Sequence, residues 1–280
     1  MISEIESKPR IISASRRSDI PAFFGERFIK AVEQGGVDVI NPFSKQTYYV
    51  PLKPGSTAAI VFWSKNFRPF FNRLVQLERR GFERFIFNFT ITGLPKVFEP
   101  NVPPVEETVS DFFELSRRYG EKAVFWRFDP ILFSNITDED YYIKRFTELA
   151  GKIAPFTKRC IFSFAFFYHK VKRSLEALDK QEGVRAFDAD IQRKREMAEL
   201  MAEIAASHGL EFQACCCEYL ENVPGVKGAH CVDGELVSEM MGGEYSFKLK
   251  PSRAGCGCAE SSDIGEYGSC KGGCLYCYAR

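Results

Sequence analysis

The sequence predicts an α/β protein whose core is a single β/α barrel of the TIM type, complete or partial. From Ile11 onward, short apolar runs alternate with amphipathic stretches, in six or seven strand–helix units. Continuous apolar strands separated by helices are typical of parallel sheets that are covered on both faces. With 280 residues and 45% hydrophobic content, the chain is long enough to bury one large core. These observations favour a barrel-like parallel sheet over two small domains.

The expected strands are the apolar runs at 11–15, 37–40, 58–63, 84–90, 123–128, 160–166 and 211–216. The expected helices are the amphipathic stretches at 22–34, 68–80, 106–119, 138–153 and 190–208. Thr137-Asp-Glu-Asp places acceptors and acidic groups at a helix start, where the helix dipole favours them. Gly120 and Gly209 lie where helices are expected to end.

We expect residues 1–219 to form the barrel and residues 220–280 to form a Cys-rich extension packed on it within the same domain. No apolar run approaches the roughly 20 residues that cross a bilayer, so no membrane association is expected. Residues 1–10 contain acidic residues and no apolar core, unlike a secretory signal. Ten cysteines are then better explained as metal ligands than as disulfides, and we expect a cytoplasmic protein.

Three cysteines near the end of the sequence are spaced by three and then two residues: Cys270, Cys274 and Cys277. Three thiolates on one small loop can hold three corners of an iron–sulfur cube, which leaves the fourth iron without a ligand from this loop. Gly272 and Gly273 allow a tight turn between the first two ligands. The alternative is a zinc or disulfide knot, in which a distant cysteine supplies the fourth zinc ligand.

This spacing, with Tyr276 before the last cysteine, resembles that of the radical SAM enzymes. The resemblance implies a [4Fe-4S] cluster whose open iron binds S-adenosylmethionine. The reduced cluster would cleave that cofactor and yield a radical that abstracts hydrogen from a substrate. A reductant such as flavodoxin or ferredoxin would be the expected partner. The substrate, a small molecule or a nucleotide, is left open.

Nearly the whole chain also resembles a bacterial family known only as a domain of unknown function with a radical-SAM-like cysteine cluster at its C terminus. The resemblance is carried by Ser13-Ala-Ser-Arg-Arg-Ser-Asp-Ile-Pro-Ala-Phe23, Trp126-Arg-Phe-Asp-Pro130, and Cys256-Gly-Cys258 followed by Asp263-Ile-Gly-Glu-Tyr267. The family implies the same cofactors and assigns no reaction.

The carboxyl ends of parallel strands form the functional face of such a sheet. The polar side chains expected there as catalytic or substrate-contacting groups are Arg17, Asp19, Lys65, Asn66, Arg127 and Asp129. Those expected to contact the cofactor are Tyr276, Thr90 and Ser163. Arg127 and Asp129 are explained equally well as a structural ion pair, because charge networks are common at barrel rims. Side-chain alternation predicts that at most one of Arg16 and Arg17 points inward.

The remaining cysteines suggest a second metal site, for zinc or another Fe–S cluster, with the ligands Cys216, Cys231, Cys256 and Cys258. Alternation in the three-cysteine run predicts that Cys215 and Cys217 face one way and Cys216 the other. The family resemblance favours Cys216, which Glu218 follows two residues later. The alternative is that these cysteines are small buried core residues.

The segment Met241-Gly-Gly-Glu244 is similar to a Gly-Gly-Glu segment that contacts the cofactor's methionyl amine in radical SAM enzymes, but Gly-Gly is also typical of turns, and we interpret it as a turn.

The leading hypothesis is therefore a radical-SAM-like iron–sulfur enzyme. One alternative is a non-catalytic binding or redox-sensing protein that zinc or a cluster stabilises. Another is nucleic-acid repair or modification, because Cys274-Leu-Tyr-Cys-Tyr278 is similar to the cysteine loop of spore photoproduct lyases. The net charge of +1 argues against the last, since phosphate binding needs a basic stripe.

Overall fold

The computed structural model describes residues 8–243 and 245–280. Eight strands form one sheet in the order β10-β1-β4-β5-β6-β7-β8-β9, and every neighbouring pair is parallel. The strands are β1 (Arg10–Ala14), β4 (Thr57–Ser64), β5 (Phe85–Thr90), β6 (Val124–Ile131), β7 (Arg159–Phe164), β8 (Glu211–Ala214), β9 (Val226–Gly228) and β10 (Ser261–Asp263). The predicted α/β class and parallel sheet are confirmed. Within the described residues, β9 and β10 end this order and do not pair with each other, so closure into a barrel stays a prediction.

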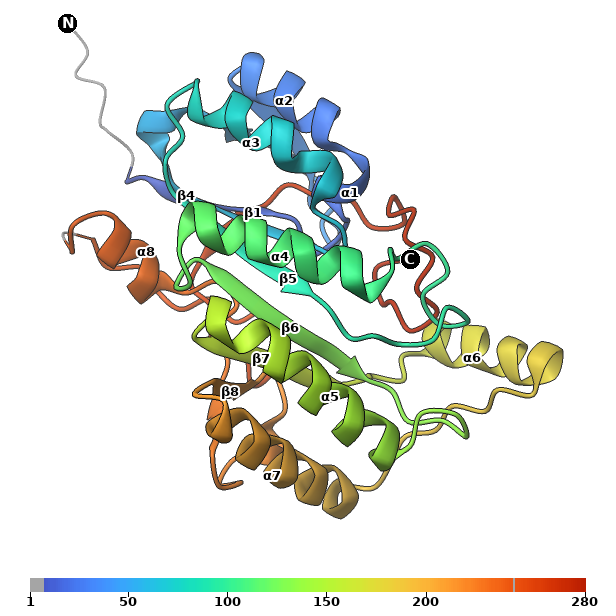
Figure 1. Ribbon diagram of the computed structural model, residues 1–280. Helices are drawn as coiled ribbons and strands as arrows, with labels where there is room; N and C mark the ends of the chain where they lie inside the picture. Colours follow the sequence, from blue (N-terminus) through green and yellow to red (C-terminus); the bar gives the residue numbers. More distant parts are fainter. Residues whose placement is uncertain (1–7, 244) are drawn as a thin grey trace, which may run out of the picture.

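The helices are α1 (Ile20–Phe23), α2 (Gly25–Glu33), α3 (Phe71–Glu78), α4 (Val105–Tyr119), α5 (Glu139–Ile153), α6 (His169–Glu182), α7 (Ile191–Ser207) and α8 (Gly234–Met240). Helices α3, α4, α5 and α7 lie along one face of the sheet (Figure 1). Asp138 caps α5 through a side-chain hydrogen bond, and Gly120 ends α4 with φ 86°, both as predicted. The single helix expected at 22–34 is instead divided into α1 and α2, which meet at Phe24.

In strands β1, β4, β5, β6 and β7, neighbouring residues pack into two different cores. Ile12 and Phe62 belong to the large core that also contains the helices. Ile11 and Val61 belong to a second core with residues of the C-terminal extension, including Val237 of α8. Because both faces of the sheet are covered in this way, the strands read as continuous apolar runs.

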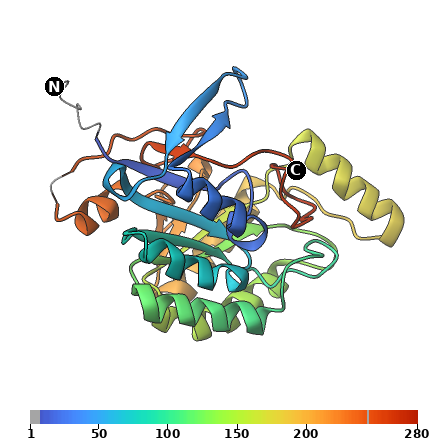
Figure 2. The ribbon, with the colours of Figure 1, turned by 90° about the horizontal axis from the view of Figure 1, so that it is seen from above.

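The strand predicted at 37–40 lies outside the parallel sheet, so that part of the prediction is wrong. Strand β2 (Gly36–Ile40) pairs antiparallel with β3 (Thr47–Pro51) in a separate two-stranded sheet. The side chain of Asn41 accepts hydrogen bonds from the N–H groups of Phe43 and Ser44, and this turn reverses the chain. The hairpin projects from the molecule (Figure 2), which leaves Ile40 exposed.

The C-terminal extension adds a strand to each edge of the sheet. Strand β9 pairs with β8, and β10 pairs with β1, where Ser13 is aligned with Asp263. The C terminus lies toward the end of the sheet to which the β6 arrow points (Figure 1). The cysteine loop therefore lies at the carboxyl ends of the strands. The boundary predicted at residue 219 stays a prediction.

No helix in the described part of the chain is long and apolar enough to span a membrane.

Candidate functional site

A cavity of about 880 Å³ opens at the carboxyl ends of the strands, and both groups of cysteines line it. The predicted site residues that line this cavity are Arg17, Asp19, Lys65, Asn66, Thr90, Arg127, Asp129, Cys216, Cys231, Cys256, Cys258, Cys270, Cys274, Tyr276 and Cys277. Ser163 does not line it; its hydroxyl donates to Asp129 instead. The fold thus brings the predicted residues to one place, while their roles stay predictions.

The cysteine loop has backbone N–H groups directed at its sulfurs. The N–H of Gly272 lies 3.4 Å from Sγ of Cys270, and that of Ala279 lies 3.3 Å from Sγ of Cys277. A Cβ atom at Gly272 would lie 3.4 Å from Sγ of Cys270 and 3.8 Å from Sγ of Cys274, so the loop wraps closely around its own thiols. Burial raises the pKa of Cys274 to about 12, so a metal ion would have to displace its proton.

Glu99 is a buried carboxylate beside this loop, and the sequence analysis did not single it out. It accepts a hydrogen bond of 2.9 Å from Nζ of Lys65 and another from the hydroxyl of Tyr276, and it contacts Thr92 Oγ1 at 3.1 Å. Burial by itself would lower the pKa of Lys65, but the charges of Glu99 and Cys274 and the hydrogen bond to Glu99 together outweigh burial, so the pKa is raised. Lys65 and Tyr276 are therefore held in place by one shared partner.

Asp19 joins the end of β1 to the end of β4. Its carboxylate caps α1 by accepting from the N–H of Ala22 at 2.9 Å, and it accepts from the hydroxyl of Ser64 at 2.6 Å and the N–H of Lys65 at 3.1 Å. Burial raises the pKa of Asp19 to about 6 in spite of these hydrogen bonds. These contacts make Asp19 a group that positions the Lys65 backbone.

Arg127 and Asp129 form the ion pair that was expected as one alternative. The Arg127 guanidinium is buried; it lies 5.1 Å from the ring centroid of Trp63, and its Nη1 donates to Sγ of Cys231 at 2.9 Å. The pair therefore connects the strand ends to the second group of cysteines.

Arg16 and Arg17 both line the cavity, so the prediction that at most one points inward is wrong. Strand β1 ends at Ala14, and alternation no longer applies beyond it. Both guanidiniums approach the buried carboxylate of Asp263, at 3.6 and 3.9 Å. Sequence reasoning missed Asp263 as a site residue, although it begins the Asp-Ile-Gly-Glu-Tyr motif.

The cysteines after β8 differ from the predicted arrangement. Strand β8 ends at Ala214, and Cys216 has a left-handed backbone with φ 57°, so side chains do not alternate here. The sulfurs of Cys215 and Cys216 are 3.7 Å apart on the same side, whereas Cys217 packs in the other core, against Tyr219. The prediction of which way these three cysteines face is therefore wrong. Cys215 lies with Cys216, and not Cys216 alone, in the second group of cysteines, which also contains Cys231, Cys256 and Cys258.

The cysteine side chains of the described residues are not arranged as a metal site. In residues 8–243 and 245–280, no group of three or more His, Cys, Asp or Glu side chains could hold a metal ion as they are placed. The ten cysteines are all free thiols. The segment 241–243 forms a turn after α8, as predicted, while Glu244 of the Gly-Gly-Glu match lies outside the described residues.

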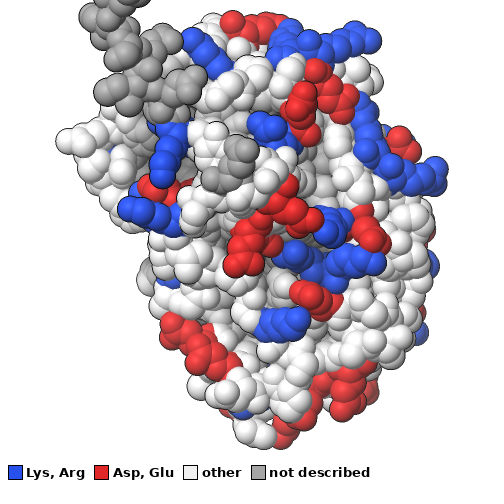
Figure 3. All heavy atoms as spheres, turned by 90° about the vertical axis from the view of Figure 1, so that its left-hand side faces the viewer, with Lys and Arg blue, Asp and Glu red and all other residues white. Residues whose placement is uncertain are grey.

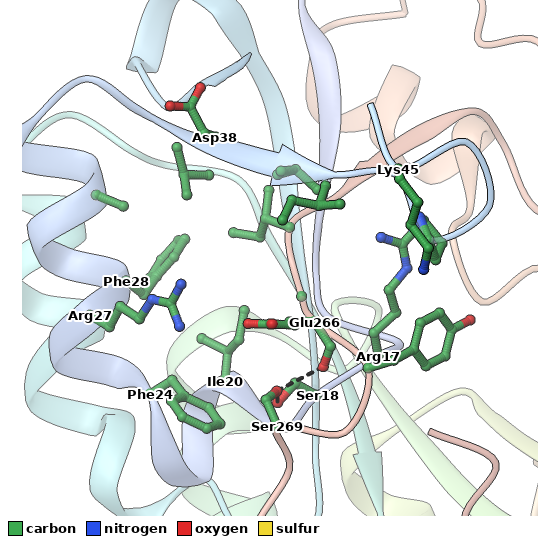
Figure 4. A pocket seen from close by; sticks show the side chains of 18 residues that line it. Arg17, Ser18, Ile20, Phe24, Arg27, Phe28, Asp38, Lys45, Glu266 and Ser269 are labelled. Carbon is green, nitrogen blue, oxygen red and sulfur yellow. Dashed lines mark hydrogen bonds between the residues drawn. The ribbon is translucent and has the colours of Figure 1, made fainter. Parts of the chain in front are cut away.

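A smaller cavity of about 460 Å³ adjoins the large one and shares Arg17, Ser18, Pro42 and Tyr267 with it. Ile20 of α1, Phe28 of α2 and Phe24 between the two helices form part of its apolar wall (Figure 4). Ser269 donates to Ser18 at 2.8 Å at its edge, which ties the start of the cysteine loop to the β1 end. On the side of the molecule that carries α8, basic and acidic side chains are interspersed, without a basic stripe (Figure 3).

The model of one protein family, described as Domain of unknown function (DUF1848), matches residues 11–279. No curated protein matches the chain. Among solved structures, a D-hydantoinase from Bacillus sp. AR9 is similar over 66% of this chain and 42% of its own, with 11% identity and a TM-score of 0.32. This chain thus spans less than half the length of that protein.

Proposed function

Because the chain belongs to this family of unknown function, we propose from its own residues that it is a radical-SAM-like iron–sulfur enzyme. The observation that carries the proposal is that Cys270, Cys274 and Cys277 share one loop and all line the large cavity at the strand ends. The ligand set of three thiolates on one loop suits a four-iron cluster with one open iron. The substrate would occupy the rest of the cavity.

The residues of the loop fit such a cluster. Two N–H groups are directed at thiol sulfurs, an interaction that stabilises and tunes Fe–S centres. Lys65, Glu99 and Tyr276 lie in the surroundings of Cys274 and are engaged with one another. Because these side chains bind one another, they would not serve as a fourth ligand, and the fourth iron would be left open for S-adenosylmethionine.

When bound, the cluster and S-adenosylmethionine would supply one-electron cleavage and hydrogen abstraction, and the protein's part is to bind, orient and exclude water. Tyr276 is held by Glu99 beside the loop and would cover the cofactor. Thr90 lines the same cavity and would contact the cofactor, while Ser163, which donates to Asp129, would act through that carboxylate. Arg17, Lys65, Asn66, Arg127 and Asp129 would hold a polar substrate. Asp19 would position Lys65.

The free cysteines indicate the cellular compartment in which we expect this enzyme. Ten free cysteines suit a reducing compartment such as the cytoplasm. A low-potential reductant such as flavodoxin or ferredoxin would supply the electron.

The test is the electron paramagnetic resonance spectrum of anaerobically purified, dithionite-reduced protein, with and without S-adenosylmethionine. We expect a [4Fe-4S]⁺ signal that changes shape when the cofactor is added. Cys274→Ala should abolish that signal, while the matched control Cys217→Ala should keep it, because Cys217 packs in the other core. A variant at Cys274 that retains the full signal would overturn the assignment.

The non-catalytic alternative has support of its own, because the loop is docked by several contacts. Asn101 Nδ2 donates to the backbone carbonyl of Lys271 at 2.9 Å. The hydroxyl of Tyr278 donates to the backbone carbonyl of Arg16, also at 2.9 Å. A metal there would reinforce this attachment. A cluster whose spectrum ignores S-adenosylmethionine, or a firmly bound zinc in its place, would favour this alternative.

A further inference from the structure

Five neighbouring thiols line one part of the wall of the large cavity, and we call this group the ring. Sγ of Cys215 lies 3.7 Å from Sγ of Cys216 and 3.6 Å from Sγ of Cys231. Cys256 interacts with Cys216 and Cys258, and Cys258 interacts with Cys231. The five come from the end of β8, the segment after β9 and the loop before β10, so only the fold brings them together.

The two sulfur separations match those of thiolates around a single ion. A tetrahedral zinc site with Zn–S bonds of about 2.3 Å has sulfurs about 3.8 Å apart. The cysteine sulfurs of a four-iron cube lie further apart, because the cube itself stands between them. The spacing at Cys215 therefore favours one ion over a second cluster.

The backbone is shaped to bring these thiols together. Cys216 has φ 57°, a conformation that is unfavourable for a residue with a side chain, and it turns its thiol to the side of Cys215. Between Cys256 and Cys258, a Cβ at Gly257 would lie 2.8 Å from Cε1 of His230 and 3.2 Å from a backbone carbonyl oxygen. Glycine thus allows this loop to approach the segment of Cys231 closely.

The charges around the ring suit an anionic metal centre. Four thiolates around a divalent ion leave an excess of negative charge, which needs cations or N–H groups nearby. Arg127 donates to Sγ of Cys231 at 2.9 Å, and the backbone N–H of Val232 donates to Sγ of Cys258 at 3.4 Å. Arg253 also interacts with Cys216.

We propose that this ring is a second metal site, separate from the loop of Cys270, in which four of the five thiolates bind one divalent ion of zinc or iron. Cys215 and Cys231 are two of the ligands. As each metal–sulfur bond forms, the thiol releases its proton to solvent. In the structure these thiols contact one another and do not surround a central space. Metal binding therefore requires the side chains to change rotamer, so that four sulfurs face one ion. The ion ties the extension to the end of β8 and completes the cavity wall.

The experiment uses the full chain with the substitutions Cys270→Ala, Cys274→Ala and Cys277→Ala, which remove the loop's thiols. Zinc, iron and acid-labile sulfide are measured after anaerobic purification, together with X-ray absorption at the metal edge. We expect one ion per chain, no sulfide, and four sulfurs at about 2.3 Å. Substoichiometric metal even after incubation with zinc, or sulfide together with several irons, would overturn the proposal.

Two further variants in that background locate the ion, with circular dichroism to verify folding. The double variant Cys215→Ser, Cys231→Ser should lose the ion, because only three of the five thiols then remain. Cys217→Ala should keep it, because the Cys217 thiol contacts Tyr219 at 3.5 Å and packs in the other core. Equal loss from both variants would show that the ring does not supply the ligands. The spectroscopic test of the Cys270 loop does not depend on this outcome, so each proposal can fail alone.

Discussion

Asp263 on β10 accepts a hydrogen bond of 2.7 Å from the hydroxyl of Ser15, although 248 residues separate the two. The same carboxylate accepts from the hydroxyl of Ser13 and from the N–H of Arg16, both at 2.9 Å. It thereby fixes a short edge strand to the end of β1. The cysteine loop follows β10 directly, so its position above the strand ends depends on this buried carboxylate.

Replacing Asp263 by Ala should lower the free energy of unfolding by about 3–5 kcal/mol, because it leaves buried hydroxyls and the Arg16 guanidinium without their partner. Urea denaturation measures this loss. The control is Glu260→Ala, which removes an exposed ion pair with Lys250 and should cost no more than about 1 kcal/mol. Similar losses in the two variants would contradict the role assigned to Asp263.

Gly265→Ala should disturb the same contact from the other side. A Cβ at Gly265 would lie 1.8 Å from Oγ and 2.6 Å from Cβ of Ser15, so the Ser15 side chain must move. We expect a loss of about 1–3 kcal/mol or more in unfolding free energy. Adding Ser15→Gly should recover part of it by removing the clash. Gly55→Ala, with no atom within 4 Å of the added Cβ, is the control, and an equal loss there would refute the argument.

The buried pair of Lys65 and Glu99 should show strong energetic coupling. Removing either partner leaves the other charge buried alone, so Lys65→Met and Glu99→Ala should each cost about 3–5 kcal/mol. The double variant should cost clearly less than the sum of the two. The exposed pair of Lys158 and Glu121, at 2.8 Å, provides the matched cycle, with an expected coupling of about 0–1 kcal/mol. Equal coupling energies in the two cycles would show that burial does not matter here.

Asp19 should make stability depend on pH. Its pKa is about 6 in the folded protein and 3.8 when exposed, so the folded state binds more protons between these values. Stability should therefore fall as pH rises from about 4 to 6, by about 2–3 kcal/mol for this group. Asp19→Asn cannot titrate and should lack this component. The comparison is the unfolding free energy of both proteins across this range; parallel curves would contradict the raised pKa.

Local signals in the sequence were enough to predict six of the eight strands of the parallel sheet and several helices. Strand β4 is a run of apolar residues that is buried on both faces, and α5 begins at the Asp138 cap, so each is specified by its own residues. The run at 37–40 is apolar apart from Asp38, but it pairs with β3, because the Asn41 turn returns the chain beside it. Strands β9 and β10 were missed because three residues each carry no periodic pattern.

The sequence by itself determined the parallel α/β sheet and the loop of Cys270, Cys274 and Cys277, because apolar periodicity and ligand spacing act over a few neighbouring residues. Only the tertiary structure decided that Glu99 holds Tyr276, that Asp263 meets Ser15, and that Cys215 meets Cys231. Such contacts join segments far apart in the chain. Their existence depends on strand order and on how the extension packs, which no local pattern encodes.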